Sequence, residues 1–111
     1  MAISKENKQF IDDLIDYYIS EADSYRGIAE AYTPEIESVV DTAFGIIAGC
    51  VYSGFLQAYQ NQKLTPSLED MREFNSILKD RAPLIKKAIM NKKEQEPKTK
   101  EATEKSEITK E

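Results

Sequence analysis

The most apolar segment of this chain is residues 42–59, TAFGIIAGCVYSGFLQAY, which carries no charged side chain. It is about as long as the shortest membrane-spanning helices, which need roughly 17–25 apolar residues. It also holds three glycines and the polar residues Thr42, Ser53 and Gln57, and no basic run flanks it. These features favour a buried helix over a membrane span. The N-terminal residues lack the apolar core of a signal peptide, so we expect a cytoplasmic protein without a membrane segment.

Apolar residues recur at intervals of three and four on both sides of this segment as well, which is the spacing of one helix face. No alternating pattern typical of a strand competes with it. The pattern predicts three long helices, over residues 4–32, 34–61 and from about 66 or 68 to about 90.

Capping residues support these helix starts. Ser4 suits the N-cap of the first helix, because its hydroxyl can accept a free backbone N–H. Thr33 followed by Pro34 suits the start of the second, since proline is tolerated at the first helical position. Two starts for the third helix stay open: Thr65 with Pro66, or Ser67 with Asp70.

The fold class that follows is an all-α, antiparallel bundle of three long helices with short connections. Pro83 lies inside the third helix, where it removes one backbone donor, so we expect a kink or a short break there. The apolar spacing continues beyond Pro83, so the direction of the helix should not reverse.

Residues 91–111 differ in composition from the rest of the chain. They hold one isoleucine, no aromatic residue and balanced opposite charges. Such a segment buries too little apolar surface to offset the entropy of ordering its backbone. We therefore expect a helical domain at 1–90 and a disordered, charged tail at 91–111.

The second predicted helix carries small residues on the side opposite its large apolar ones. An interior glycine costs a helix about 1 kcal/mol relative to alanine, so two on one side need a reason. The reason is either a tight contact with a helix of the same chain or an interface with another chain, a second copy or a different protein. Because two flanking helices cannot cover a third on all sides, we expect the interface. Its residues would be Thr42, Gly45, Gly49, Tyr52, Ser53 and Leu56.

Two charged residues interrupt the apolar stripes of the outer helices. Glu21 falls between apolar positions of the first helix, and Arg81 between those of the third. A charge buried without a partner is costly, so we expect either that Glu21 and Arg81 form a buried ion pair or that both reach water.

Lysines at seven-residue spacing share the polar side of the third helix and its extension. Such a stripe could contact phosphate groups or an acidic partner, or could simply be solvated. It comprises Lys79, Lys86, Lys87 and Lys93.

The composition excludes several classes of catalytic site. The chain has no histidine and one cysteine, Cys50, which rules out His-dependent triads, histidine metal ligands and internal disulfides. Asp12, Asp13 and Asp16 match the DDxxD letters of isoprenoid synthases, but over five residues only, and are best interpreted as a solvated face. We expect no enzymatic activity and no cofactor or metal.

The sequence therefore favours a protein–protein interaction module, a small accessory subunit of a larger intracellular assembly that could process nucleic acid. The alternative is a protein that binds nucleic acid directly through the lysine stripe.

Overall fold

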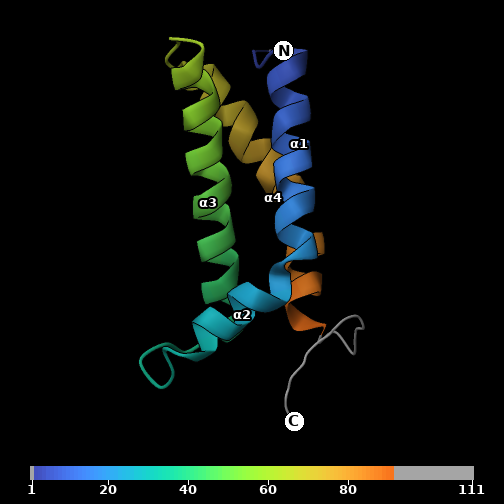
Figure 1. Ribbon diagram of the computed structural model, residues 1–111, viewed down its shortest axis with the longest axis vertical. Helices are drawn as coiled ribbons and strands as arrows, with labels where there is room; N and C mark the ends of the chain where they lie inside the picture. Colours follow the sequence, from blue (N-terminus) through green and yellow to red (C-terminus); the bar gives the residue numbers. More distant parts are fainter. Residues whose placement is uncertain (1, 92–111) are drawn as a thin grey trace.

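The structure, a computed structural model, describes residues 2–91, and this part of the chain is entirely helical with connecting loops and turns (Figure 1). The prediction of an all-α fold is confirmed. There are four helices in these residues rather than three, and the expected tail lies outside them except for its first residue. The helices are α1 (Lys5–Ser20), α2 (Ala22–Glu30), α3 (Val39–Asn61) and α4 (Leu68–Met90).

The prediction of one helix over residues 4–32 is wrong, because the helix breaks at Glu21. The backbone of Glu21 leaves helical geometry, with φ −105° and ψ 14°, and α2 then runs across one end of the bundle (Figure 1). This turn brings Ala22 and Ala29 into the core. The start of α1 is as predicted, since the Ser4 hydroxyl accepts a hydrogen bond from the Asn7 N–H at 3.1 Å.

The second predicted helix starts later than Pro34. Its N-cap is Ser38, whose hydroxyl accepts from the Asp41 N–H at 3.0 Å, and α3 begins at Val39. The residues between α2 and α3 form turns, in which the Thr33 hydroxyl donates to the Glu30 carbonyl at 2.9 Å. A serine N-cap with an acidic first turn thus sets the helix start in place of the proline.

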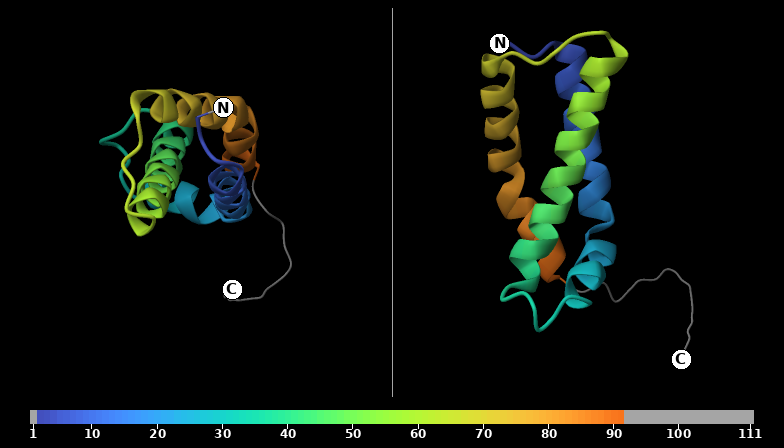
Figure 2. Two further views of the ribbon diagram at one scale, coloured as in Figure 1. Left: turned by 90° about the horizontal axis from the view of Figure 1, so that it is seen from above. Right: turned by 90° about the vertical axis from the view of Figure 1, so that its left-hand side faces the viewer.

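The structure decides between the two starts of α4 that the sequence left open. Ser67 is the N-cap and forms a reciprocal capping box with Asp70, with both hydrogen bonds at 3.0 Å. Pro83 lies inside a helix that continues to Met90, and the ribbon of α4 bends without breaking (Figure 2).

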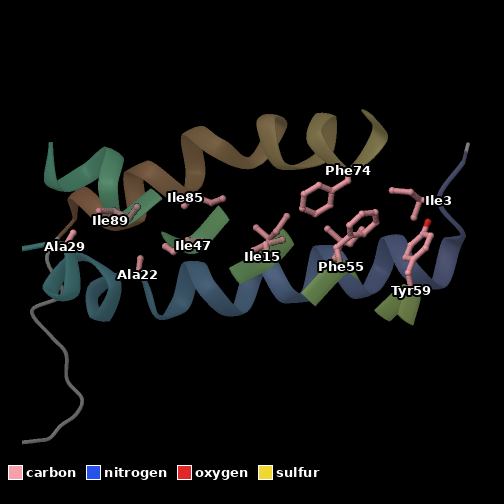
Figure 3. Close-up of a cluster of buried hydrophobic side chains, with 13 residues drawn as sticks. Ile3, Ile15, Ala22, Ala29, Ile47, Phe55, Tyr59, Phe74, Ile85 and Ile89 are labelled. Atoms are coloured by element: carbon pink, nitrogen blue, oxygen red, sulfur yellow. The ribbon is translucent and has the colours of Figure 1, made fainter. Parts of the chain in front are cut away.

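The core lies between α3 and the other three helices. α3 contributes buried residues four apart, and the ring of Phe55 stacks on that of Phe74 of α4 at 4.5 Å between centroids (Figure 3). Across the core, α1 contributes Ile11 and Ile15, both fully buried. The buried residues of α3 are Ala43, Ile47, Val51, Phe55 and Tyr59.

Polar contacts hold the two ends of the bundle. At one end, the Gln62 amide donates to Asn7 Oδ1 at 2.8 Å, joining the loop after α3 to α1. At the other end, Arg26 Nη1 of α2 donates at 2.7 Å to the carbonyl of Ile89, close to the end of α4. The Arg26 side chain thus satisfies one of the carbonyls that a helix end leaves free.

Candidate protein-interaction surface

The outer side of α3 faces solvent along most of the helix. α1 and α4 lie on its two flanks, and α3 is seen in front of them in the right-hand view of Figure 2. We call the six residues predicted as an interface the outer strip of α3. Gly45, Gly49 and Ser53 are exposed, and Tyr52 is 39% exposed. The other two, Thr42 and Leu56, are half-buried.

The glycines of the outer strip make no close contact with other parts of the described residues, 2–91. A Cβ built on Gly45 or on Gly49 would meet no atom within 4 Å other than its own local helix. For these two positions, a tight contact between helices of the same chain is therefore the wrong explanation. Their missing side chains leave open space in front of α3.

Gly54, on the same helix, behaves differently. A Cβ placed there would lie 2.4 Å from Cδ2 of Leu14 in α1, so the absence of a side chain at Gly54 gives room to Leu14. One glycine of α3 thus serves the fold of the chain itself, whereas Gly45 and Gly49 do not.

A groove that the sequence did not reveal lies between α1 and α3, beside Gly54. It has a volume of about 360 Å³. Phe10, at its edge, is 41% exposed, and Tyr17, two helical turns further along α1, is 54% exposed. The third glycine of the segment was the signal for a close helix contact here. Its lining residues are Asn7, Phe10, Gly54, Gln57, Ala58, Asn61 and Gln62.

The expected pair of Glu21 and Arg81 is not formed. Arg81 does point toward α1, but its partners there are Asp16, in direct contact, and Asp12 at 3.8 Å. The Arg81 side chain is 22% exposed and Asp16 is 65% exposed, so this cluster is open to water. Glu21 is exposed, because the break between α1 and α2 falls at this residue.

The three aspartates of the DDxxD letters are occupied by neighbouring side chains. Asp12 also binds Lys8 at 3.2 Å, and Asp13 accepts from Gln9 at 2.9 Å. Within residues 2–91, no group of three or more metal-ligating side chains could hold a metal ion.

One lysine of the stripe is paired with a carboxylate of the same chain, and two others are exposed. Lys86 binds Asp41 of α3 at 2.8 Å, and this hydrogen bond and charge hold the pKa of Asp41 below its usual value. Lys79 and Lys87 are exposed on α4. Lys93 lies outside the described residues.

One tyrosine on each of α1, α2 and α3 is buried or half-buried: Tyr18, Tyr25 and Tyr59. Burial, followed by the nearby Cys50 thiol, raises the pKa of Tyr18, whose ring contacts that of Tyr25 edge-on at 5.5 Å. Burial also raises the pKa of Tyr59. Since these phenols stay protonated at neutral pH, they act here as packing groups with a polar tip.

By length and composition alone, α3 is also the one helix of the described residues that could cross a membrane. Only 22% of its most apolar 18-residue window is buried within the chain. The core helix of a soluble protein can pass the same test, so the result is weak evidence for a span. The low buried fraction shows that the other described residues leave part of the apolar surface of α3 uncovered.

Comparisons with family models, with curated proteins and with solved structures found no match.

Proposed function

We propose that the protein is a non-enzymatic protein–protein interaction module whose contact surface is the outer strip of α3. The observation that carries this proposal is the open space in front of Gly45 and Gly49. Each glycine costs the helix about 1 kcal/mol relative to alanine, and no contact among residues 2–91 offsets that cost. A helix of another chain would do so, because backbones approach closely where a Cβ is absent.

The chemistry of the outer strip supports a protein partner. Past Asp41, α3 carries no charged residue, and the strip combines small residues with the aromatic ring of Tyr52 and the side chain of Leu56. Tyrosine is one of the residue types most often found to dominate binding energy at protein interfaces. On the neighbouring α1, the exposed rings of Phe10 and Tyr17 add apolar surface to the same region.

The proposed role is that of a small accessory subunit in a larger intracellular assembly, which could process nucleic acid. Direct nucleic-acid binding through the lysine stripe has less support, because Lys86 is engaged with Asp41. An enzyme is also disfavoured, since the chain has no histidine and the described aspartates of the DDxxD letters have partners.

Leucines placed on the outer strip test the proposal. The double variant Gly45→Leu, Gly49→Leu fills the open space and should abolish partner binding without disturbing the fold. Gly27→Leu on α2 is the matched control, because a Cβ there also meets nothing within 4 Å.

Binding is measured by quantitative cross-linking and affinity capture of the three proteins, after circular dichroism has verified their helicity. Partners, including further copies of the chain, should be retained by the wild type and by Gly27→Leu and lost by the double variant. Equal retention by all three proteins would overturn the proposal. Binding of labelled DNA or RNA that survives moderate salt and is lost on charge reversal of Lys79 and Lys87 would favour the nucleic-acid alternative instead.

A further inference from the structure

We infer that the groove between α1 and α3, beside Gly54, binds a basic amphipathic helix of another protein. This groove is a different surface from the outer strip of α3, so the inference does not rest on the proposed function. Three features identify the occupant: the lining of the groove, the apolar side of α1 that continues from it, and the charges around it.

The lining of the groove suits an apolar side chain. The small residues Gly54 and Ala58 and the ring of Phe10 contribute to it. Its volume of about 360 Å³ is at the lower end of the roughly 300–1,000 Å³ of sites that enclose a small molecule. The lining residues come only from α1, α3 and the residue that follows α3. Viewed along the bundle, α4 lies beside the pair of α1 and α3 (Figure 2), so a helix placed in the groove would not displace α4.

The polar side chains of the lining are hydrogen-bonded to one another. Gln57 donates to Asn61 at 3.0 Å, and Gln62 donates to Asn7 at 2.8 Å. Gln62 also donates to the carbonyl of Ala58 at 2.9 Å. Amides engaged in this way offer fewer free groups to orient a small polar ligand. The lining therefore favours an apolar anchor that belongs to a larger partner.

The apolar surface continues from the groove along α1. Leu14 and Tyr17 follow Phe10 at four and seven residues, so all three lie on one side of the helix. Phe10 and Tyr17 are exposed, and Leu14 is half-buried. Seven residues of helix span about 10 Å. This length suits a partner helix whose apolar anchors recur at i, i+3 or i+4 and i+7.

The exposed charges on this side of α1 are acidic. Glu6, Asp13 and Glu21 lie four residues before, three after and eleven after Phe10, and these spacings share one side of a helix. All three are exposed, and within residues 2–91 none of them forms a salt bridge. Asp13 accepts a hydrogen bond from the neutral amide of Gln9 at 2.9 Å. These carboxylates are therefore available to a basic partner.

The lysines of α1 do not neutralise these acids. Lys8 binds Asp12 at 3.2 Å, and Asp12 lies 3.8 Å from Arg81 of α4, so this cluster belongs to the side of α1 that faces α4. Lys5 precedes Phe10 by five residues, a spacing that puts it on a different side of the helix.

The other helices add little positive charge near the groove. α3 has no charged residue after Asp41, and Lys63 lies just beyond its end. Arg26 of α2 points to the end of α4, where it donates to the carbonyl of Ile89. The rim of the groove is therefore acidic along α1 and neutral along α3, with one lysine at its end. Such a rim favours lysine or arginine beside the apolar stripe of the partner.

The same charges disfavour a second copy as the occupant, because the chain carries a net charge of −5. A contact with a single helix is small beside the roughly 800 Å² per partner of a stable interface. We therefore expect a dissociation constant in the micromolar range, about 1–100 µM.

Synthetic peptides test the chemistry of the occupant. The probe is a leucine–lysine peptide of about 18 residues, or about 27 Å of helix, with its leucines at three-and-four spacing. One control replaces every lysine by glutamate, and another shuffles the order so that no apolar side forms. Fluorescence anisotropy with the full chain should show binding by the probe and at least about tenfold weaker binding by both controls. Equal affinity of the probe and either control, or no binding of the probe up to about 500 µM, overturns the inference.

Paired variants test the location. Phe10→Ser removes the apolar ring at the edge of the groove, and Asp13→Lys reverses a charge of its rim. Each should weaken binding of the probe at least about tenfold. Leu84→Ser and Asp80→Lys, at exposed positions of α4, are the matched controls and should change binding less than about twofold. Circular dichroism verifies the helicity of all four variants. Equal losses in the groove variants and their controls would contradict binding in the groove.

The double variant Gly45→Leu, Gly49→Leu separates this inference from the proposed function. It should bind the probe as tightly as the wild type does, even though it loses the partners of the outer strip. Loss of the probe by this variant would assign the probe to the outer strip and overturn the inference about the groove. Self-association of the chain that Phe10→Ser abolishes, in the absence of probe binding, would assign the groove to a second copy and also overturn it.

Discussion

The inner and outer sides of α3 are both uncharged beyond its first turn, yet they have opposite surroundings. The inner side packs Phe55 against Phe74, and Gly54 gives room to Leu14. The outer side leaves Gly45 and Gly49 facing open space. The glycine at position 54 is thus explained by packing between helices, whereas those at positions 45 and 49 are not. The difference shows that a glycine in a helix has to be interpreted by what stands in front of it.

The largest expected difference in stability is between alanine variants of two neighbouring residues of α3, one on its inner side and one at the edge of the outer strip. Phe55→Ala removes a fully buried ring and should lower the free energy of unfolding by about 3–5 kcal/mol. Leu56→Ala, half-buried at the edge of the outer strip, should cost clearly less. Urea unfolding followed by circular dichroism measures both. Similar losses for the two variants would mean that the inner and outer sides do not differ as described.

The same substitution at two glycines should act in opposite directions. Gly54→Leu forces Leu14 away from α3 and should destabilise the protein by about 1–3 kcal/mol. Gly49→Leu meets no obstacle in the part of the chain that the structure describes and should stabilise the monomer by up to about 1 kcal/mol through helix propensity.

These two variants are compared by urea unfolding at low protein concentration, so that self-association does not enter the result. A Gly49→Leu variant as unstable as Gly54→Leu would show that the space in front of Gly49 is filled by the chain itself.

A smaller effect distinguishes the partners of Arg81. Arg81→Ala and Asp16→Ala should be coupled in a double-mutant cycle by some tenths of a kcal/mol, the usual size for a pair that is partly open to water. Arg81→Ala and Glu21→Ala should be additive. Coupling between Arg81 and Glu21 alone would contradict the ion pairs described here.

The smallest effect concerns pH. Lys86 holds the pKa of Asp41 below its usual value, so the folded state keeps this carboxylate ionised at lower pH than the unfolded state does. The resulting stabilisation is present above the unfolded pKa and is lost as pH falls through the folded pKa.

Lys86→Met should raise the pKa of Asp41 toward its usual value, as followed by the carboxyl carbon shift in NMR. Lys87→Met, at the next position on α4, is the control and should leave the pKa unchanged. An Asp41 pKa that is insensitive to Lys86→Met would rule out the contact between α3 and α4 at this point.

Much of the fold could be predicted from local signals in the sequence. Three-and-four spacing of apolar residues gave the all-helical class, and Ser67 with Asp70 was one of the two starts considered for α4. Both signals act within one or two helical turns, so no knowledge of the tertiary structure is needed to interpret them.

The break at Glu21 could not be predicted in the same way. Apolar spacing continues from α1 into α2, because Ala22 and Ala29 are buried in the core even though the helix turns there. The partner of Arg81 was missed for the same reason, since a straight helix over 4–32 places Glu21 in the apolar stripe. Whether Gly45 and Gly49 face open space depends on where α1 and α4 pack against α3. The spacing of apolar residues along a single helix carries no information on that packing.

The position of Pro83 in α4 has one further consequence. Proline leaves the carbonyl of Lys79 without its helical donor, and both residues are exposed, so water can take the place of the missing hydrogen bond. The two halves of α4 can therefore differ in direction, one lying along Phe55 and the other reaching α2. The bend thus lets a single helix pack against α3 at one end of the bundle and against α2 at the other.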